Sequence, residues 1–494
     1  MAREEEIIKE RLKKIEDFRK ARINPYPHKF EKKNNAGELQ EEYKKLKNEE
    51  FGKKAVVAGR IMAIRSFGKL VFMKLRDETG DIQLVFVPKK GKESEDKVKS
   101  ITKTVDVGDI VGCSGKVFRT KRGELSIMAE EINMLAKSIK PLPEKWHGLQ
   151  DKEERYRKRY LDLIMNPEVR KTFEKRTAIM EAIRALLKEK GFSEVETPFL
   201  NTLYGGASAR PFETKLNALD MKLYLAISPE LYLKRLIVGG YEKVYTISRN
   251  FRNEGIDRWH NPEFSMMEIY QAYADYNDMM NLFEEIYEYV CKKVNGSTKV
   301  EFRGKTIDFK RPWKRTTMAA AIKEYGKIDV TKMGEKEVLE YVKKNNIKIK
   351  KETWGWAIQG MFEHYCEEKI EQPTFILDHP LETTPLCKVH RNGSQFCQLI
   401  ERFEPFCMGA ELGNAYSELN DPILQRKLLE DQQKMLNKGD LEANPLDEDF
   451  INAIEIGMPP TGGLGLGIDR MVMLFTGQDS IRDVILFPFM KEKE

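Results

Sequence analysis

The stretch NFRNEGIDRWHNPEFSMMEIY, residues 250–270, mixes carboxylates, two arginines, a histidine and aromatic rings with apolar residues. We interpret it as the centre of a β-hairpin, with one strand over 243–254, a loop over 255–262 and a return strand over 263–273. The charges occupy positions where a strand that only packs into a core would not need them. The stretch therefore predicts a sheet that carries a charged site on one face.

Alternation of side chains assigns the residues of this hairpin to two faces. On the return strand, the residues of one face are Phe264, Met266, Glu268 and Tyr270. Met267 and Ile269 lie between them and should enter the core. On the outgoing strand Phe251 should be buried, which leaves Arg252 and Glu254 on the polar side. The hairpin therefore predicts a cleft wall with charges of both signs.

A second group of polar residues lies far downstream, in ELGNAYSELND, residues 411–421. There Asn414, Tyr416 and Glu418 alternate onto one face of a strand. Gly413 permits a bulge that would bring Glu411 to the same cleft. The preceding ERFEPF adds Glu404. Clustered carboxylates of this kind are typical ligands of Mg²⁺ that bridges phosphates.

The segment TGGLGLGIDRMVMLF, residues 461–475, predicts a glycine-rich strand that leads into a helix with Arg470 in its first turns. It lacks the lysine and the serine or threonine of a P-loop. We interpret the glycines as positions where the base and ribose of a nucleotide approach the backbone closely. Arg470 is then placed to meet phosphate.

Composition limits the class of protein. The chain has 494 residues, of which 41% are hydrophobic, so it should form two or more globular domains. Its 85 Lys and Arg against 79 Asp and Glu give a net charge of only +6, which says little about partners. No apolar run reaches the roughly 20 residues of a membrane span, and the start MAREEEIIKERLKK is too acidic for a targeting peptide. We expect a cytoplasmic protein.

The N-terminal part predicts two structures. Residues 1–50 form a helical extension, in which Ile7, Ile8, Leu12 and Ile15 recur at helical spacing. Residues 51–137 contain five short β-rich runs with a helical interruption near 94–104, which predicts a small barrel of the OB type.

One aromatic residue of the predicted barrel stands out. Alternation in KLVFMKLRD turns Phe72 outward, beside Lys74 and Arg65. An exposed aromatic ring near cations suits the stacking of a nucleic-acid base. The alternative is an ordinary surface phenylalanine that the N-terminal helices cover.

The remaining chain divides into a linker over 138–164 and one large domain over 165–494, with a helical insertion at about 277–372. The first helix of this domain should run from Pro167 to Lys190 and stop at Gly191.

The six cysteines form no CxxC pair, and we expect them to be reduced thiols. Cys387, His390, Cys397 and Cys407 could in principle bind zinc, but their spacing matches no compact zinc knuckle. A metal at these residues remains open.

Several motifs together resemble those of the class II lysyl-tRNA synthetases over nearly the whole chain. FRNEGIDRWHNPEFSMMEIYQAYADY resembles motif 2 of that family, and GGLGLGIDRMVMLFTGQDSIRDVILFPF resembles motif 3. The helix that runs into GFSEVETPFL resembles motif 1, and RYRKRYLDLI, GGASARPF and SPELYLKRLIVGG are similar to other family segments. The resemblance implies an α+β fold: an N-terminal OB-fold β-barrel that binds the anticodon, and a class II synthetase catalytic domain built on an antiparallel β-sheet flanked by helices.

The resemblance also implies site residues. The catalytic arginines would be Arg252 and Arg470, and the Mg²⁺ ligands Glu404 and Glu411. Phe264 would stack on adenine, with Arg470 on its opposite face. The full ATP-binding set would be Arg252, Glu254, His260, Asn261, Phe264, Glu404, Glu411 and Arg470.

For lysine, the resemblance implies that Glu230 and the backbone at Gly206 meet the α-amine and that Asn414 lies near the carboxylate. The ε-ammonium would meet Glu268, Tyr270 and Glu418, with Tyr416 closing the pocket and Arg252 on the carboxylate. The anticodon-binding residues would be Arg65, Phe72, Gln83 and Glu124.

The implied reaction is ATP-dependent attachment of L-lysine to tRNA(Lys) through a lysyl-adenylate, by a homodimer joined through the motif 1 region. Aspartyl and asparaginyl relatives would need basic or amide groups where this chain has carboxylates. A ligase that lysylates a protein would normally lack the barrel, and a non-catalytic relative should have lost Arg252, Arg470 or the acidic pair.

The chain departs from the usual family pattern at a few positions. It has TKLNALD at 214–220 where relatives usually read THHNALD, which places Lys215 and Leu216 there. It has YLAISPEL at 224–231 in place of YLRIAPEL, so that Ala226 replaces an arginine, and Thr246 replaces a common glutamate. These changes leave the details of substrate access open.

Overall fold

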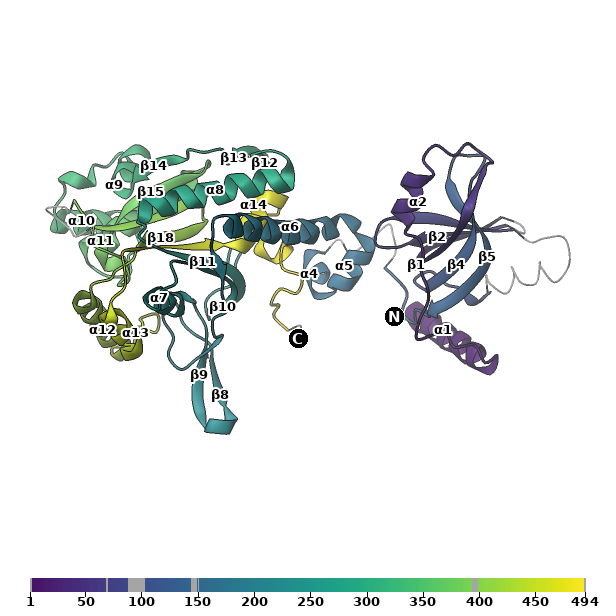
Figure 1. Ribbon diagram of the computed structural model, residues 1–494, viewed down its shortest axis with the longest axis horizontal. Helices are drawn as coiled ribbons and strands as arrows, with labels where there is room; N and C mark the ends of the chain where they lie inside the picture. The colour runs from purple at the N-terminus through teal and green to yellow at the C-terminus, as the bar shows by residue number, and fades with distance from the viewer. Residues whose placement is uncertain are drawn as a thin grey trace. The chain divides into compact units, whose positions relative to one another are not determined.

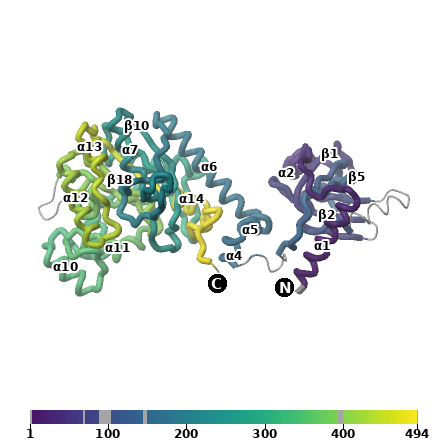
Figure 2. Tube along the Cα trace, turned by 90° about the horizontal axis from the view of Figure 1, so that it is seen from below, coloured from purple at the N-terminus to yellow at the C-terminus, as the bar shows by residue number. Residues whose placement is uncertain are grey.

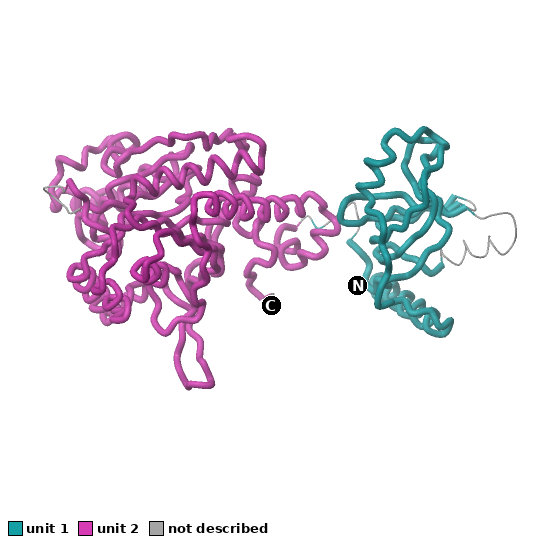
Figure 3. The backbone as a smooth tube through the Cα atoms, in the orientation of Figure 1, with its two compact units in different colours: residues 1–149 teal, residues 150–494 magenta. Residues whose placement is uncertain are grey.

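The computed structural model of the chain is drawn in Figure 1. The residues that it describes are 2–67, 70–87, 103–143, 149, 151–392 and 399–492. They divide into two compact units, residues 1–149 and 150–494 (Figure 3). Each unit has its own core and is described separately.

Unit 1 contains a closed five-stranded barrel with the strand order β1-β2-β3-β5-β4. Its strands are β1 (Phe51–Phe67), β2 (Leu70–Arg76), β3 (Asp81–Phe86), β4 (Ile110–Arg119) and β5 (Leu125–Ala136). Only the β3–β5 pair is parallel. The five-stranded barrel predicted from the sequence is confirmed, whereas most of the predicted helical interruption near 94–104 falls on residues 88–102, outside the described residues.

Alternation fixes the faces of the barrel strands. In β2, Val71, Met73 and Leu75 are buried in the barrel core, whereas Phe72 and Lys74 point outward, as predicted. Two helices precede the barrel, α1 (Ala2–Lys20) and α2 (Ala36–Glu42).

The buried face of α1 differs from the prediction. Leu12 is 45% exposed, whereas Arg11 and Ile15 are buried. Arg11 donates hydrogen bonds to the carbonyls of Val107, Ser138 and Lys140 at 2.9–3.0 Å. The helix therefore docks through a hydrogen-bonded arginine, which hydrophobic periodicity does not reveal.

Unit 2 is built on a large sheet with the strand order β14-β15-β16-β18-β19-β11-β10-β6, and β17 pairs with β16. All neighbouring pairs are antiparallel except β10–β6 and β14–β15. The strands of this sheet are β6 (Ser193–Glu194), β10 (Lys243–Phe251), β11 (Glu263–Ala272), β14 (Lys314–Thr317), β15 (Thr374–Pro380), β16 (Leu399–Cys407), β17 (Ala410–Glu411), β18 (Gly413–Ser417) and β19 (Thr461–Gly467).

Two smaller sheets accompany the large one. The first consists of β7 (Leu200–Asn201), β8 (Glu213–Leu216) and β9 (Met221–Leu225), and β8 and β9 project as an arm in Figure 1. The second is the hairpin β12 (Lys299–Phe302) and β13 (Lys305–Asp308). Together with β14, this hairpin lies inside the region 277–372 that the sequence predicted as helical, so that prediction is wrong for residues 299–317.

The helices of unit 2 cover the sheet. They are α4 (Lys152–Arg157), α5 (Arg159–Met165), α6 (Pro167–Glu189), α7 (Glu230–Val238), α8 (Tyr276–Asn295), α9 (Met318–Ala321), α10 (Glu335–Lys344), α11 (Trp354–Tyr365), α12 (Pro422–Asn437), α13 (Glu448–Ile456) and α14 (Ile468–Thr476). Helix α6 ends just before Gly191, whose φ of 79° favours glycine. No helix in the described part of the chain is long and apolar enough to cross a membrane.

The main core lies on one face of the sheet. Buried residues of α6, α8 and α14 pack there against β11, β16, β18 and β19. Met267 and Ile269 of β11 belong to this core, as alternation predicted. Helices α12 and α13 lie side by side at one end of the unit (Figures 1 and 2) and pack through Leu429 and Phe450. The opposite face of the central strands is left to line a cavity.

The hairpin at the centre of the prediction is shorter than expected. Strand β10 ends at Phe251, so Arg252 and Glu254 lie in the loop between the strands. Pro262 stands opposite Arg252 and accepts its amide hydrogen bond at 2.9 Å, but it has no N–H with which to continue the ladder. Phe251 is only half-buried.

Candidate active site

One cavity of about 660 Å³ opens on the polar face of the sheet in unit 2. Each residue that the sequence assigned to ATP or lysine contributes to its lining. These residues are Gly206, Glu230, Arg252, Glu254, His260, Asn261, Phe264, Glu268, Tyr270, Glu404, Glu411, Asn414, Tyr416, Glu418 and Arg470. The residues assigned from the sequence therefore line one cavity, although they are spread over more than half of the chain.

One end of the cavity holds three buried carboxylates, Glu230 on α7, Glu268 on β11 and Glu418 just after β18. The hydroxyl of Tyr270 donates to Glu268 at 3.1 Å, and that of Tyr416 donates to Glu230 at 3.3 Å. Burial of three carboxylates beside Lys234, the single buried cation among the described residues of this end, is costly unless further cations reach them. This end of the cavity is therefore built to receive positive charge.

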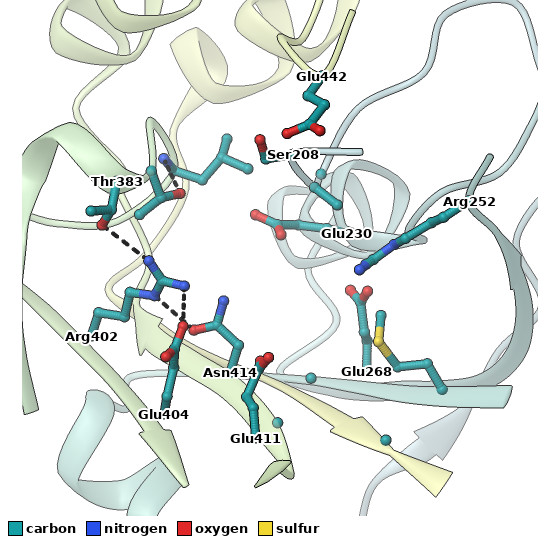
Figure 4. Close-up of a pocket in the computed structure, with 18 of the residues that line it drawn as sticks. Ser208, Glu230, Arg252, Glu268, Thr383, Arg402, Glu404, Glu411, Asn414 and Glu442 are labelled. Atoms are coloured by element: carbon teal, nitrogen blue, oxygen red, sulfur yellow. Dashed lines mark hydrogen bonds and ion pairs between the residues drawn. The ribbon is translucent and has the colours of Figure 1, made fainter. Parts of the chain in front are cut away.

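Glu268 points into the open part of the cavity together with Glu230 and Arg252 (Figure 4). Burial raises its pKa to about 8, and the charge of Glu230 contributes to this shift. Ser228, which sequence reasoning missed, donates a hydrogen bond to Glu268 at 2.7 Å. Without a bound cation, Glu268 is mostly protonated at neutral pH.

Glycines of β19 and of the neighbouring strand β18 are required by close contacts that the sequence did not reveal. A Cβ atom on Gly463 would lie 1.7 Å from a carboxylate oxygen of Glu418. A Cβ atom on Gly413, in the neighbouring strand, would lie 2.3 Å from the carbonyl oxygen of Gly465. The glycines thus make room for the acidic end of the cavity and for close approach of β18 to β19.

The other end of the cavity carries two arginines. The guanidinium of Arg252 lies over the ring of Phe264, 5.1 Å from its centre. Arg470 lies 3.2 Å from Nε2 of His260 and 3.6 Å from the carboxylate of Glu411. This end is therefore suited to bind an anion next to an aromatic ring.

The acidic pair Glu404 and Glu411 lines the same cavity, beside Arg402 and Asn414 (Figure 4). The register of β16 with β17 and β18 shifts by one residue, since Phe403 pairs with Ala415 but Phe406 pairs with Glu411. This shift is the predicted irregularity, and it turns Glu411 into the cavity. Burial raises the pKa of both carboxylates, and the charge of Glu404 adds to the shift at Glu411.

Arg402 is a further residue that sequence reasoning missed. It forms an ion pair with Glu404 and donates to the side-chain oxygens of Asn414 at 2.9 Å and Thr383 at 3.0 Å (Figure 4). These contacts of Arg402 hold the side chains of Glu404 and Asn414 in place. The only sequence signal was its place two residues before Glu404 on the same strand face.

Asn261 is buried in the wall of the cavity. Its side-chain nitrogen donates to the carbonyl of Glu263 at 2.6 Å, whereas its side-chain oxygen has no partner among the described residues. An unpaired buried acceptor of this kind is available to a ligand that donates a hydrogen bond.

In unit 1, strand register brings the predicted anticodon-binding residues to the outer face of the barrel. Arg65 pairs with Phe72 across β1 and β2, and Lys74 pairs with Gln83 across β2 and β3. Gln83 donates to Ser126 of β5 at 2.9 Å, two residues after Glu124. Phe72 is half-buried against the edge of Phe67, and Lys74 forms a 2.7 Å ion pair with Asp81.

The described cysteines near His390 in the sequence, Cys387 and Cys407, do not form a metal-binding cluster with it. Cys387 and Cys407 are buried thiols bonded weakly to backbone carbonyls, and Cys397 lies outside the described residues. Among the residues that the structure describes, no group of three or more His, Cys, Asp or Glu side chains could hold a metal ion.

The departures from the family pattern lie mostly outside the cavity. Thr246 is buried and pairs with Glu268 across β10 and β11. The carbonyl of Ala226 accepts the amide of Phe251 at 2.9 Å. Lys215 forms an exposed ion pair with Asp220 on the arm. Two departures thus reach the acidic end: Thr246, and Ser228, which stands where YLRIAPEL has alanine and donates to Glu268.

Comparisons with known proteins agree with this geometry. The profile of a family described as tRNA synthetases class II (D, K and N) matches residues 151–491, and that of an OB-fold nucleic acid binding domain matches residues 55–135. Lysine–tRNA ligase of Clostridium novyi (strain NT) is 51% identical over 98% of this chain and 94% of the relative. The lysine–tRNA ligase of Clostridium kluyveri is 50% identical over 99% and 97%, and that of Clostridium acetobutylicum 49% over 99% and 94%.

Proposed function

Because the chain belongs to the lysine–tRNA ligases of the class II tRNA synthetases, we propose that the cavity in unit 2 forms lysyl-adenylate with the residues placed there. The overall reaction is the ATP-dependent attachment of lysine to tRNA. The observation that carries the assignment of residues is the acidic end of the cavity, with three buried carboxylates and two tyrosine hydroxyls.

In this proposal the acidic end binds the two ammonium groups of lysine. Glu230, beside the backbone of Gly206, takes the α-ammonium, and Glu268 with Tyr270 and Glu418 takes the ε-ammonium. A neutral side chain would leave a buried carboxylate unpaired, and this would weaken its binding by roughly several kcal/mol relative to lysine. Aspartate would place a negative charge there. The acidic end therefore argues against an aspartyl or asparaginyl enzyme.

ATP occupies the other end in this proposal. Phe264 offers a face for adenine, the unpaired oxygen of Asn261 suits an amino group, and Glu254 and His260 complete the nucleotide set. Since Arg252 covers one side of Phe264, the base stacks on the side toward Arg470. Arg252 is placed between the α-phosphate and the lysine carboxylate, next to Asn414.

Mg²⁺ is part of the proposal. Two carboxylates that share one cavity with anion-binding arginines match the usual protein contribution to a Mg²⁺–nucleotide site, in which phosphates and waters supply the other ligands. Glu404 and Glu411 would hold the ion, which would neutralise phosphate charge when bound.

The chemistry needs no protein nucleophile. The lysine carboxylate attacks the α-phosphorus in line and pyrophosphate leaves. The 3′-hydroxyl of the terminal adenosine of tRNA then attacks the lysyl carbonyl, and AMP leaves. Arg252 and Arg470 compensate the negative charge that develops on the phosphates, and the cavity holds the two reactants in contact.

The other assignments follow from family membership and remain part of the proposal. Residues 51–137 form the anticodon-binding domain, preceded by the helical extension 1–50 and joined by the linker 138–164 to the catalytic domain 165–494. We also propose a homodimer through the motif 1 region, where Phe199, Leu200 and Leu203 are 42–52% exposed in the single chain. A cytoplasmic location is consistent with a role in protein synthesis.

The pH dependence of lysine binding tests the acidic end. Because Glu268 has a pKa of about 8 in the empty cavity, lysine must displace its proton at lower pH. Affinity should therefore be greatest above pH 8 and fall by up to about tenfold per unit as the pH drops to 6. Calorimetric titration should detect a net release of protons when lysine binds near pH 7. Glu268→Gln should remove this dependence, and constant affinity between pH 6 and 8 in the wild type would refute the assignment.

The barrel assignment is tested with Phe72→Ala. If Phe72 stacks an anticodon base, its loss should weaken tRNA binding by roughly 1–3 kcal/mol, seen as a raised KM for tRNA in charging assays. Lysine-dependent ATP–pyrophosphate exchange should stay unchanged, because it does not involve the barrel. Phe51→Ala is the matched control, since Phe51 is another exposed ring of the barrel, stacked on Phe118. Normal charging by Phe72→Ala would make Phe72 an ordinary surface residue.

A further inference from the structure

Lys234 is the one cation among the buried groups at the acidic end, within the part of the chain that the structure describes. It lies on α7, one turn after Glu230, and its side chain has no exposed surface. Its ammonium is 2.6 Å from Glu230 and also forms an ion pair with Glu418. Lys234 does not line the cavity itself but stands behind two of the carboxylates that do.

The surroundings of Lys234 are unusually acidic. Glu230 and Glu418 touch it, and the neighbouring titratable and charged groups are Glu268 and Tyr270 on β11, Arg402 on β16, Tyr416 on β18 and the thiol of Cys387. Burial raises the pKa of Glu418 well above its ordinary value, whereas the ion pair with Lys234 lowers it. On the remaining side the ring of Phe450 from α13 lies 5.9 Å from the ammonium. Burial alone would lower the pKa of Lys234, but Glu230 and Glu418 raise it above its ordinary value. Lys234 therefore stays charged.

The net charge of the acidic end balances the two ammonium groups of lysine only if the positive charge of Lys234 is included. Three carboxylates and one ammonium leave two negative charges when all are ionised. Lysine brings two ammonium groups, while its carboxylate faces Arg252. We propose that Lys234 is an internal counter-ion whose ion pairs with Glu230 and Glu418 reduce the number of protons that lysine must displace when it binds. This inference rests on the proposed lysine site.

Without Lys234, two further carboxylates would be buried with no cation in contact. Such groups take up protons, because burial disfavours their charged form. Lysine would then have to displace more protons than in the wild type, so its affinity would depend more steeply on pH. A lysine that only supports the fold would change stability but would leave the number of protons released by the substrate unchanged. Lys234 therefore acts on lysine binding through the charges of Glu230 and Glu418, without touching the substrate.

The experiment is lysine titration by calorimetry between pH 6.5 and 9, in pairs of buffers with different ionisation enthalpies, which yields the number of protons released. The wild type should release fewer protons per lysine bound near pH 7 than Lys234→Met, which removes the charge but keeps most of the side-chain length. Lys234→Met should also bind lysine about tenfold more weakly at pH 7 and recover as the pH rises. Lys234→Arg, which keeps the charge, should return the proton count toward that of the wild type.

Arg235→Met is the matched control. Arg235 follows Lys234 on α7 but pairs with Asp447 at 2.8 Å, away from the cavity, so its replacement should leave the proton count unchanged. A wild-type count in Lys234→Met would overturn the inference. Should Lys234→Met not fold, Lys234→Gln takes its place, and a wild-type proton count in that variant would overturn the inference equally. If Glu268→Gln binds lysine normally, the proposed site itself fails; if Glu268→Gln loses lysine while Lys234→Met keeps the wild-type profile, only the counter-ion inference fails.

Discussion

Replacement of Arg252 by alanine is expected to reduce lysyl-adenylate formation by two orders of magnitude or more while leaving the fold intact. Arg252 lies in the loop after β10, where its side chain contacts the ring of Phe264 and the carbonyl of Ile227 at 3.4 Å. A preorganised positive charge at a reacting phosphate contributes about 3 kcal/mol or more to the transition state. Few other contacts of the fold depend on the guanidinium, so stability should change little.

The measurement is lysine-dependent ATP–pyrophosphate exchange, accompanied by thermal unfolding. Arg249→Ala serves as the matched control, because Arg249 lies three residues earlier and forms a surface ion pair with Glu263 at 3.7 Å. Its exchange rate should remain close to that of the wild type. An Arg252→Ala enzyme that exchanges at the wild-type rate would show that the reacting phosphate is bound elsewhere.

The second large effect is expected for Glu268→Gln. The substitution keeps the shape of the side chain but removes a buried carboxylate that accepts from Ser228 and Tyr270. Loss of one partner of a buried ion pair costs about 3 kcal/mol or more, which corresponds to roughly a hundredfold weaker lysine binding. Binding of ATP should change far less, since Glu268 is not among the groups assigned to the nucleotide.

Thr246→Ala gives the control for Glu268→Gln. Thr246 is buried beside Glu268 in the neighbouring strand, but its side chain does not line the cavity. Its loss should therefore change lysine affinity far less. Equal losses in the two variants would mean that packing of the hairpin, and not the carboxylate charge, controls lysine binding.

The amino-acid sequence predicts the parts of this site that depend on strand periodicity. Alternation correctly separated Met267 and Ile269, in the core, from Glu268 and Tyr270, in the cavity. It succeeds because β11 is a regular strand in the centre of the sheet, where each side chain faces either the core or the cavity. For the same reason Phe72 was placed on the outer face of the barrel.

The sequence is less informative where backbone contacts or distant partners decide the structure. The end of β10 at Phe251 depends on Pro262 across the hairpin, which places Arg252 in a loop rather than on a strand. Lys234 looks like a surface residue of an amphipathic helix, because its partner Glu418 lies far along the chain. No local pattern reports such a pairing.

The glycines of β19 illustrate the same limit. Their number suggested close approach of a nucleotide to the backbone. At Gly463 the space is instead needed by the Glu418 side chain of the protein itself. Steric demands of this kind become visible only when two strands have been placed side by side.

The central claim, that the acidic end of the cavity selects lysine, is tested most directly by ATP–pyrophosphate exchange with each of the twenty amino acids in turn. The wild type should respond to lysine, with little response to arginine, whose larger and planar head does not fit carboxylates arranged for a compact ammonium. Glu268→Gln, assayed beside it, should lose most of the response to lysine. Equal stimulation of the wild type by aspartate or asparagine, or an undiminished lysine response in Glu268→Gln, would contradict the account.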